Sequence, residues 1–333
     1  MRLIYIKHIM HLPDYSITNK ILNKVAEIER ARGIIENTFV LPFSQNSLRK
    51  EAKEKKIYNL LLLEEYDVSL FDIKKHFDSI SPHLDSEILK IIEIESNIDI
   101  IGKSKIPWNQ KIKNLNQKIV DSDKVFRIKK IPNKVLPEEI LAKTTDIGNW
   151  LDSDDVKNTH PLIVAAIIFA ELEIIKPFEK LSTISNILIS EMFLHSNNFK
   201  IIENIPYQEI INLKRYKYND SLEYVVKTED FTEWIDFYLD SINQQIQILK
   251  EKYILLEKEA RQKSIPLVEK LTSRQQRIYQ YLLDYKFIQN SQFSILFPDI
   301  SEDSILRDLK SLIDLGLIVK TGKTKSSKYE IKH

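Results

Sequence analysis

The scarcity of glycine constrains the fold of this chain more than any other feature of its sequence. Only Gly33, Gly102, Gly148, Gly316 and Gly322 occur among its 333 residues. Sheet-rich folds need glycine in many of their tight turns, and a dinucleotide fingerprint or a P-loop needs clustered glycines where the backbone approaches phosphate. The sequence therefore predicts a mainly α-helical protein and excludes both kinds of glycine-rich nucleotide loop.

The composition of the chain limits which cellular compartment and which kinds of binding partner can be expected. The 49 basic and 48 acidic residues nearly cancel, so any nucleic acid would have to be bound by a local patch. The chain has no cysteine, which excludes disulfides and thiolate-bound metals and fits a reducing cytoplasm. Its most apolar segment, 161–175, contains Glu171 and Glu173 and is shorter than the roughly 20 residues of a membrane span. We therefore expect a cytoplasmic protein without a membrane partner.

Apolar residues recur at three- and four-residue intervals along most of the chain, as amphipathic helices require. The exception is the segment 125–131, where the alternation of residues predicts a strand or flap. Changes in pattern divide the chain into an N-terminal helical region (1–100), a helical core (101–245), a helical connector (246–270) and a separate C-terminal module (271–333).

The connector carries an apolar stripe at three- and four-residue steps, formed by Ile246, Leu249, Tyr253 and Leu256. Such a stripe suits the seam of a homodimer and packing within one chain equally well, so both interpretations stay open.

The C-terminal module, 271–333, has a pattern of three helices followed by two strands that flank a polar tip. Thr272 or Ser273 can cap the first helix, and the Ser301 hydroxyl can cap the third by accepting an N–H from its first turn. Gly316 is a natural left-handed stop after that third helix. This order is that of a winged helix-turn-helix, so we expect a small α+β domain here.

A local excess of basic residues accompanies this pattern, since residues 271–333 contain ten basic and seven acidic side chains, a net charge of +3. The residues expected to reach bases are Ser304, Arg307 and Lys310 on the third helix, and those expected to reach phosphates are Lys320, Lys323, Lys325 and Lys328 on the wing. The module therefore predicts a DNA partner. Asp303 and Asp308 on the same helix favour the other reading, a protein-interaction module with a solvated lysine-rich tip.

The centre of the chain contains two long apolar helical stretches joined by Lys176-Pro177-Phe178, with Leu172-Glu173-Ile174-Ile175 leading into the junction. This arrangement resembles the Fic (Fido) family, whose pattern is an apolar helix ending in F-E-x-I, then H-P-F-x-D/E-G-N-G-R, then a second apolar helix. The flanks 125–151 and 218–242 are similar to the family's flap region and closing helix pair. The resemblance extends over residues 15–245 and implies a Fido-like helical body, to which winged-helix tails are joined in some Fic-like proteins.

The family's chemistry depends on motif residues that this chain lacks. The family's histidine is a general base, its acidic residue holds Mg²⁺, and its G-N-G-R loop holds the phosphates of ATP. Here Lys176 stands at the histidine, Lys180 at the metal ligand, and Leu181-Ser182-Thr183-Ile184 at G-N-G-R; Ile187 replaces a second arginine. A lysine of pKa ~10.4 is protonated at neutral pH and cannot accept a proton. The resemblance thus implies a catalytically degenerate protein without a metal site, which would bind ATP and Mg²⁺ only if residual family activity persists.

A second family element is an inhibitory helix with the pattern S/T-x-x-x-E-G/N, whose glutamate pairs with the ATP-binding arginine. Glu36 and Asn37 match its last two positions, while Arg32 stands at the Ser/Thr position. We interpret Glu36 and Asn37 as a relic of this motif, because the arginine partner would be Ile187.

We therefore predict a DNA-binding or regulatory protein with a catalytically degenerate Fic-like body. Two alternatives remain: a residual nucleotidyl or phosphocholine-type transferase with a non-standard base, and a protein-interaction scaffold. Nucleotide binding would distinguish the transferase from the scaffold, and DNA binding would distinguish the regulator from the scaffold.

Overall fold

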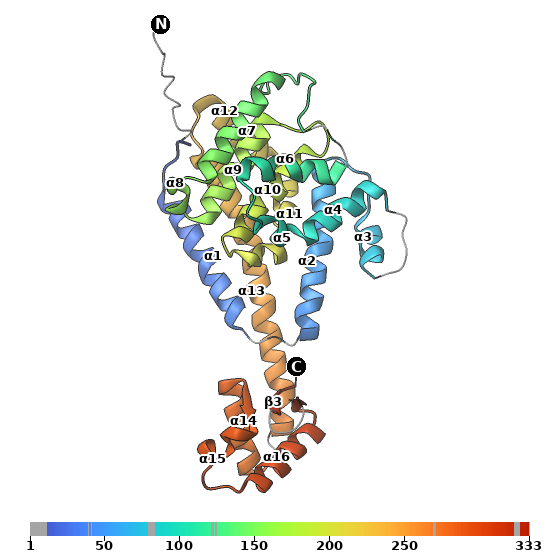
Figure 1. Cartoon of the computed structure of the whole chain (residues 1–333), viewed down its shortest axis with the longest axis vertical. Coiled ribbons are helices and arrows are strands. Elements are labelled where there is room, and N and C mark those ends of the chain that lie inside the picture. The colour runs from blue at the N-terminus through green and yellow to red at the C-terminus, as the bar shows by residue number, and fades with distance from the viewer. Residues whose placement is uncertain are drawn as a thin grey trace. The chain divides into compact units, whose positions relative to one another are not determined.

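The computed structural model describes residues 12–38, 40, 42–78, 84–120, 123, 125–268, 271–322 and 327–332. It is mainly α-helical, as the sequence predicts, and its three-stranded sheet lies near the C-terminus (Figure 1). Contacts between residues divide the chain into two units. The larger unit comprises the residues up to 37 together with 48–250, and the smaller unit comprises 38–47 together with 251–333. Among the described residues, no helix combines the length and the apolarity needed to cross a bilayer.

The larger unit is made of helices. They are α1 (Asn19–Asn37), α2 (Pro42–Leu63), α3 (Leu70–Phe77), α4 (Ser86–Ser96), α5 (Ile98–Gly102), α6 (Trp108–Val120), α7 (Pro137–Leu151), α8 (Asp154–Lys157), α9 (Pro161–Ile175), α10 (Ser182–Ser196), the 3₁₀ helix η1 (Lys200–Asn204), α11 (Gln208–Leu213), α12 (Arg215–Thr228) and α13 (Thr232–Val268). Two of these helices, α2 and α13, also include residues of the smaller unit.

Helices α9 and α10 pack against each other and form the centre of the larger unit (Figure 1). Both are buried around almost their whole circumference, as expected for helices that carry apolar residues on every face. Other helices cover this pair on all sides. From α13, for example, the Trp234 indole donates a hydrogen bond of 2.7 Å to the Ala166 carbonyl and packs edge-on against Phe169.

A cluster of buried charged side chains connects α10 to α2 and α4. The Lys56 ammonium is fully buried and lies 3.0 Å from the Glu95 carboxylate and 2.6 Å from that of Glu191, which also accepts a hydrogen bond from Gln208. Burial lowers the pKa of Lys56, but the two neighbouring carboxylates raise it by more, so this pKa lies above its ordinary value. Burial, with the nearby Lys56 charge, lowers the pKa of His195 to about 4, so this histidine is neutral at neutral pH.

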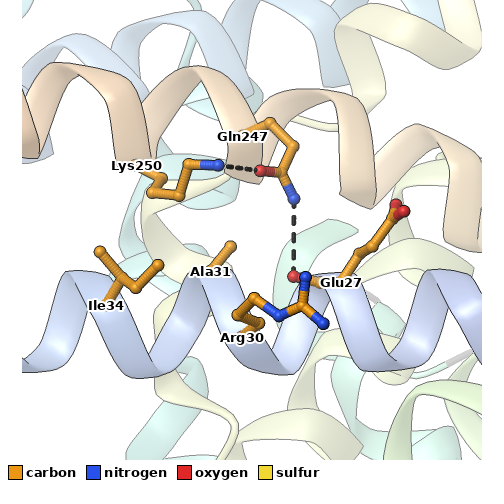
Figure 2. A pocket seen from close by; sticks show the side chains of 6 residues that line it. All are labelled: Glu27, Arg30, Ala31, Ile34, Gln247 and Lys250. Carbon is orange, nitrogen blue, oxygen red and sulfur yellow. Dashed lines mark hydrogen bonds between the residues drawn. The ribbon is translucent and has the colours of Figure 1, made fainter.

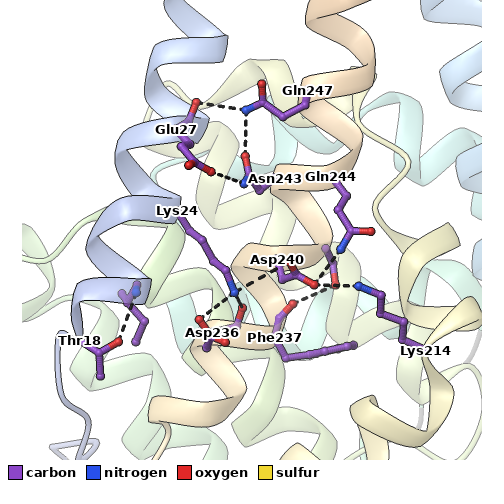
Figure 3. Close-up of polar contacts among 12 residues, drawn as sticks. Thr18, Lys24, Glu27, Lys214, Asp236, Phe237, Asp240, Asn243, Gln244 and Gln247 are labelled. Carbon is purple, nitrogen blue, oxygen red and sulfur yellow. Dashed lines mark hydrogen bonds and ion pairs between the residues drawn. The ribbon is translucent and has the colours of Figure 1, made fainter.

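Helix α1 is held to α13 by polar contacts along their length (Figure 3). The Lys24 ammonium lies 2.8 Å from the Asp236 carboxylate, and the Asn243 amide donates to the Glu27 carboxylate at 2.7 Å. These side chains are only partly buried, so the apolar face of α1, which includes Ile21 and Ile28, supplies most of the stabilisation.

The smaller unit has its own core and a sheet in the order β1-β3-β2, antiparallel throughout. Its elements are α14 (Ser273–Tyr285), β1 (Phe287–Gln289), the 3₁₀ helix η2 (Asn290–Gln292), α15 (Phe293–Leu296), α16 (Glu302–Asp314), β2 (Ile318–Thr321) and β3 (Lys328–Ile331). Thr272 caps α14 through a reciprocal capping box with Gln275, and Gly316 ends α16 with φ of 72°, so both of these local predictions are confirmed.

Three local expectations were wrong. Residues 125–131 form no strand, so of the strand or flap predicted there the strand is wrong; the Arg127 side chain donates instead to the Lys129 carbonyl within this segment and to the Lys176 carbonyl. The strand β1 was missed, since it is only three residues long. The Ser301 hydroxyl does not cap α16; it donates instead to the Ser304 hydroxyl at 2.9 Å.

Most of the apolar stripe of the connector is buried in the folded chain, and Leu256 at its end is half-buried. Ile246 is fully buried, and Leu249 and Tyr253 are nearly so. These three residues therefore pack within the chain, and a homodimer stays a prediction.

Two of the scarce glycines are required where helices approach closely. A Cβ atom on Gly148 of α7 would lie 2.6 Å from the backbone nitrogen of Asn109 on α6, and one on Gly102 would lie 2.7 Å from the Met192 carbonyl oxygen on α10. Gly33, in contrast, has open space around its Cα.

We expect Gly148→Ala to lower the free energy of unfolding by ~1–3 kcal/mol, because the backbone of α6 would have to move. The matched control is Gly33→Ala, which should raise the free energy of unfolding by up to ~1 kcal/mol through better helix propensity. Urea titrations followed by circular dichroism measure both. Equal effects of the two substitutions would contradict the close approach of α6 and α7.

Candidate functional site

The loop between α9 and α10 holds the residues that stand at the family's motif. Lys176 follows the buried helix α9 directly, Pro177 and Phe178 lie in the loop, and Ser182 begins α10, all as predicted. Lys176 and Leu181 both adopt left-handed backbone conformations, with φ of 50° and 52°. Such conformations cost of order 1 kcal/mol or more in residues other than glycine, so the surrounding contacts must fix this loop.

Arg127 supplies many of those contacts. Its guanidinium is almost fully buried and donates to the carbonyls of Lys176 at 2.7 Å, Ile175 at 3.2 Å and Lys129 at 2.8 Å, and also to that of Val135. Its own backbone N–H donates to the Pro177 carbonyl at 2.9 Å. Arg127 therefore binds the segment 127–135 to the loop after α9 and orders both.

The N-terminus of α10 is occupied by a carboxylate of the chain itself. Glu64, which follows α2, accepts hydrogen bonds from the backbone N–H groups of Thr183 at 2.5 Å and Ile184 at 3.3 Å. Free N–H groups and the helix dipole make a helix N-terminus a site for anions such as phosphate. Here Glu64 fills that role, and burial raises the pKa of its carboxyl group, although Lys176 and the two N–H groups lower it.

A second carboxylate, Glu173, is saturated with hydrogen bonds beneath the loop. It accepts from the Asn186 amide at 2.8 Å, the Tyr218 hydroxyl at 2.8 Å and the Thr183 hydroxyl at 3.4 Å. Burial raises the pKa of Tyr218 well above its ordinary value, and Glu173 raises it further, so this hydroxyl stays a donor. Glu173 therefore serves to hold the packing of α9, α10 and α12.

The remaining motif positions divide between packed and exposed side chains. Ile184 and Ile187 are fully buried, while Lys180 is exposed to solvent. The Lys176 ammonium donates to the Thr183 hydroxyl at 3.3 Å. Within the described ranges, no three His, Asp or Glu side chains gather as a metal would require.

Glu36 and Asn37 do not lie at this loop. Glu36 pairs with Arg32 at 2.9 Å, and Asn37 donates to the Gly33 carbonyl. Arg32 in turn donates to the Asn198 carbonyl, beyond the C-terminus of α10. Since α10 has 15 residues, its two ends are separated by about 20 Å.

Sequence reasoning missed Glu64 because its neighbours match the inhibitory pattern on neither side. The pattern would have Ser or Thr at position 60 and Gly or Asn at position 65, whereas the chain has Leu60 and Glu65. Glu65 nevertheless has φ of 61°, the left-handed conformation that glycine and asparagine favour. Only the contact between segments 119 residues apart reveals its role.

A cavity of about 290 Å³ lies elsewhere, between α1 and α13 (Figure 2). It is lined by Glu27, Arg30, Ala31, Ile34, Gln247 and Lys250. None of these residues takes part in the contacts of the 176–187 loop, and Lys250 is engaged by the Gln247 amide oxygen at 2.5 Å. We assign no chemistry to this cavity.

The candidate nucleic-acid interface is the outward face of α16 in the smaller unit. Ile305, Leu309 and Leu312 are fully buried in the core of that unit, as predicted, so the opposite side of α16 faces solvent. Arg307 and Lys310 lie there, exposed and without an ion-pair partner among the described residues. Ser304 is half-buried at the flank.

Asp308 does not lie on that outward face, although its place in the sequence of this helix was an argument against DNA binding. It is buried and forms a two-pronged ion pair with Arg274 of α14, whose Nη2 donates to it at 3.1 Å. Its charge is therefore neutralised inside the unit.

The lysines of the two strands differ in their surroundings. Lys320 lies opposite Tyr329, on the face of the sheet that packs against α16, and its ammonium lies 5.6 Å from the centre of the Tyr329 ring. Lys328 lies on the other face, 3.0 Å from the Glu330 carboxylate and over the Phe287 ring. Lys323 and Lys325 lie outside the described residues.

Glu64→Gln should change how stability depends on pH, because the amide can still accept the two N–H groups but cannot ionise. Since the pKa of Glu64 is raised in the folded protein, its contribution is present in full below the pKa of the unfolded chain and is lost as pH rises through the folded pKa. We therefore expect the wild type to lose stability relative to the variant as pH is raised through and above the ordinary carboxyl range. Urea titrations across that range test this, and Glu179→Gln, which removes an exposed carboxylate from the same loop, is the matched control.

Comparison with known proteins places this fold. No family model matches the chain, and no curated protein matches its sequence. Among solved structures, a Fic family protein from Desulfovibrio desulfuricans G20 is similar over 96% of this chain and 98% of its own length, with a TM-score of 0.59 and 15% identity. Fic-1 from C. elegans is similar over 72% of this chain and 74% of the solved chain, with a TM-score of 0.53 and 14% identity. The chain therefore has the fold of Fic family proteins.

Proposed function

We propose that this chain is a catalytically degenerate Fic-like protein that acts as a DNA-binding regulator through its C-terminal unit. The observation that carries the proposal is the outward face of α16, where Arg307 and Lys310 are exposed and have no ion-pair partner in the described part of the chain. Arginine and lysine at such positions bind the edge of guanine in the major groove or the phosphates beside the groove.

The order of elements in the smaller unit supports this proposal. Helix α14, strand β1, the short α15, helix α16 and the hairpin of β2 and β3 follow the order of a winged helix-turn-helix, in which α16 would be the recognition helix. The selective pairing of cations agrees with it, since Arg274, Arg277 and Lys328 are neutralised within the unit while Arg307 and Lys310 are not.

The surroundings of the α9–α10 loop support the loss of nucleotidyl transfer. Glu64 occupies the N–H groups at the start of α10 to which a nucleotide phosphate would bind, and Ile184 and Ile187 are buried where phosphate-binding arginines stand in the family. Lys176 is a cation at the position of the general base, so a target hydroxyl would find no proton acceptor there.

We expect no transfer of label from ATP to this chain or to a hydroxyl-bearing protein in the presence of Mg²⁺. Lys176→His alone should not restore transfer, because the metal and phosphate ligands are missing as well. An assay with radiolabelled ATP, with an active Fic enzyme as positive control, measures both. Robust transfer by the wild type would favour the residual transferase instead.

We expect Arg307→Ala to weaken binding of the preferred duplex by ~1–3 kcal/mol and to relax sequence preference. Lys320→Ala should weaken all sequences alike and reduce the slope of log affinity against log salt by about one. Lys328→Ala is the matched control and should change the slope less, because Glu330 already neutralises this lysine. Gel-shift titrations of the full chain at two salt concentrations measure these effects, and no retardation at low salt would leave the protein-interaction scaffold as the better proposal.

A further inference from the structure

The outward face of α16 carries carboxylates as well as cations. Asp303, Arg307, Lys310 and Asp314 are spaced by four, three and four residues, so they form one stripe along the solvent side of the helix. All four are exposed, and none has an ion-pair partner among the described residues. The two cations lie in the middle of the stripe and the two carboxylates at its ends, so its net charge is zero.

An unpaired carboxylate is costly in an interface with DNA. Phosphate groups make the partner strongly negative, so a carboxylate that enters the major groove needs a hydrogen-bond donor there. The edges of guanine and thymine offer only hydrogen-bond acceptors in that groove. Adenine offers its N6 amino group beside the N7 acceptor, which repels a carboxylate, whereas cytosine offers its N4 amino group with no acceptor beside it on the same base edge, and Asp and Glu side chains bind it. A carboxylate at the reading end of a recognition helix therefore selects a base rather than adding affinity.

The two carboxylates differ in their position along the helix. Asp303 lies in the first turn of α16, and Asp314 is its last residue. In helix-turn-helix proteins the N-terminal residues of the recognition helix contact the base edges. Asp303 is thus placed to meet a base, and Asp314 is not.

We propose that Asp303 is a specificity determinant that requires cytosine at one position of the DNA site, close to a guanine read by Arg307. The inference rests on the proposed function, because it assumes that α16 enters the major groove. Asp303 and Arg307 are one helical turn apart, about 6 Å along the axis. With a rise of about 3.4 Å per base pair, the two base pairs are about two steps apart.

A change of preferred base tests this proposal. Asparagine binds the N6 and N7 atoms of adenine, so Asp303→Asn should move the preference at that one position from cytosine to adenine. The wild type should favour cytosine there by about fivefold or more over the other bases, as expected for a good base contact. Asp303 is exposed, so this variant should remain folded, and thermal melting checks that it does.

Asp314→Asn is the matched control, because it removes the same charge from the same stripe at the other end of the helix. It should leave the preferred sequence unchanged and alter only the overall affinity. Selection of bound duplexes from a randomised pool by the full chain, followed by sequencing, compares the wild type with both variants. Arg307→Ala in the same selection identifies the neighbouring guanine.

The outcomes separate the inference from the proposed function. If the wild type enriches no duplex, the proposed function itself is wrong. If it enriches a motif that Asp303→Asn leaves unchanged, or if both carboxylate variants only increase affinity for all sequences, DNA binding stands and the role of Asp303 is overturned. A shift from cytosine to adenine with Asp303→Asn alone supports the inference.

Discussion

The burial of α10 on all sides is the constraint on which the larger unit depends. A helix that is buried around its circumference gains from apolar packing, but its first N–H groups still need acceptors. Glu64 meets this need by accepting from Thr183 and Ile184. An unpaired buried donor costs ~1–3 kcal/mol, so the end of α2 is tied to the start of α10 by the same requirement that keeps α10 in the core.

The loop before α10 is fixed by a different means, because its conformation is unfavourable in isolation. Two residues other than glycine have left-handed φ angles there, and the chain has few glycines to relieve them. Arg127 compensates by hydrogen bonding to several carbonyl groups at once, and Phe178 packs against Phe126. The buried guanidinium has carbonyl partners in place of a substrate anion, which makes it part of the architecture rather than of a binding site.

Charge is partitioned in the smaller unit. Arg274, Arg277 and Lys328 are paired with carboxylates of the same unit, whereas Arg307 and Lys310 are not paired with any that the structure describes. Exposed pairs contribute little to stability, so their main consequence is electrostatic: they decide which cations remain available to a partner. A count of basic residues along the sequence treats all of these side chains as equal, although their surroundings differ.

The sequence by itself determined what depends on neighbours along the chain. The helical class followed from the scarcity of glycine, the placement of Lys176 after α9 followed from apolar runs and Pro177, and the ends of α14 and α16 followed from Thr272 and Gly316. The tertiary structure alone decided what depends on distant segments: Glu64 at Thr183, Arg127 at Lys176, Asp308 with Arg274, and Glu36 at the far end of α10. The reason is physical. Helix periodicity and capping involve residues within about four positions, whereas the neutralisation of a buried N–H group or charge depends on whichever side chain the packing brings there, and no local pattern encodes that choice.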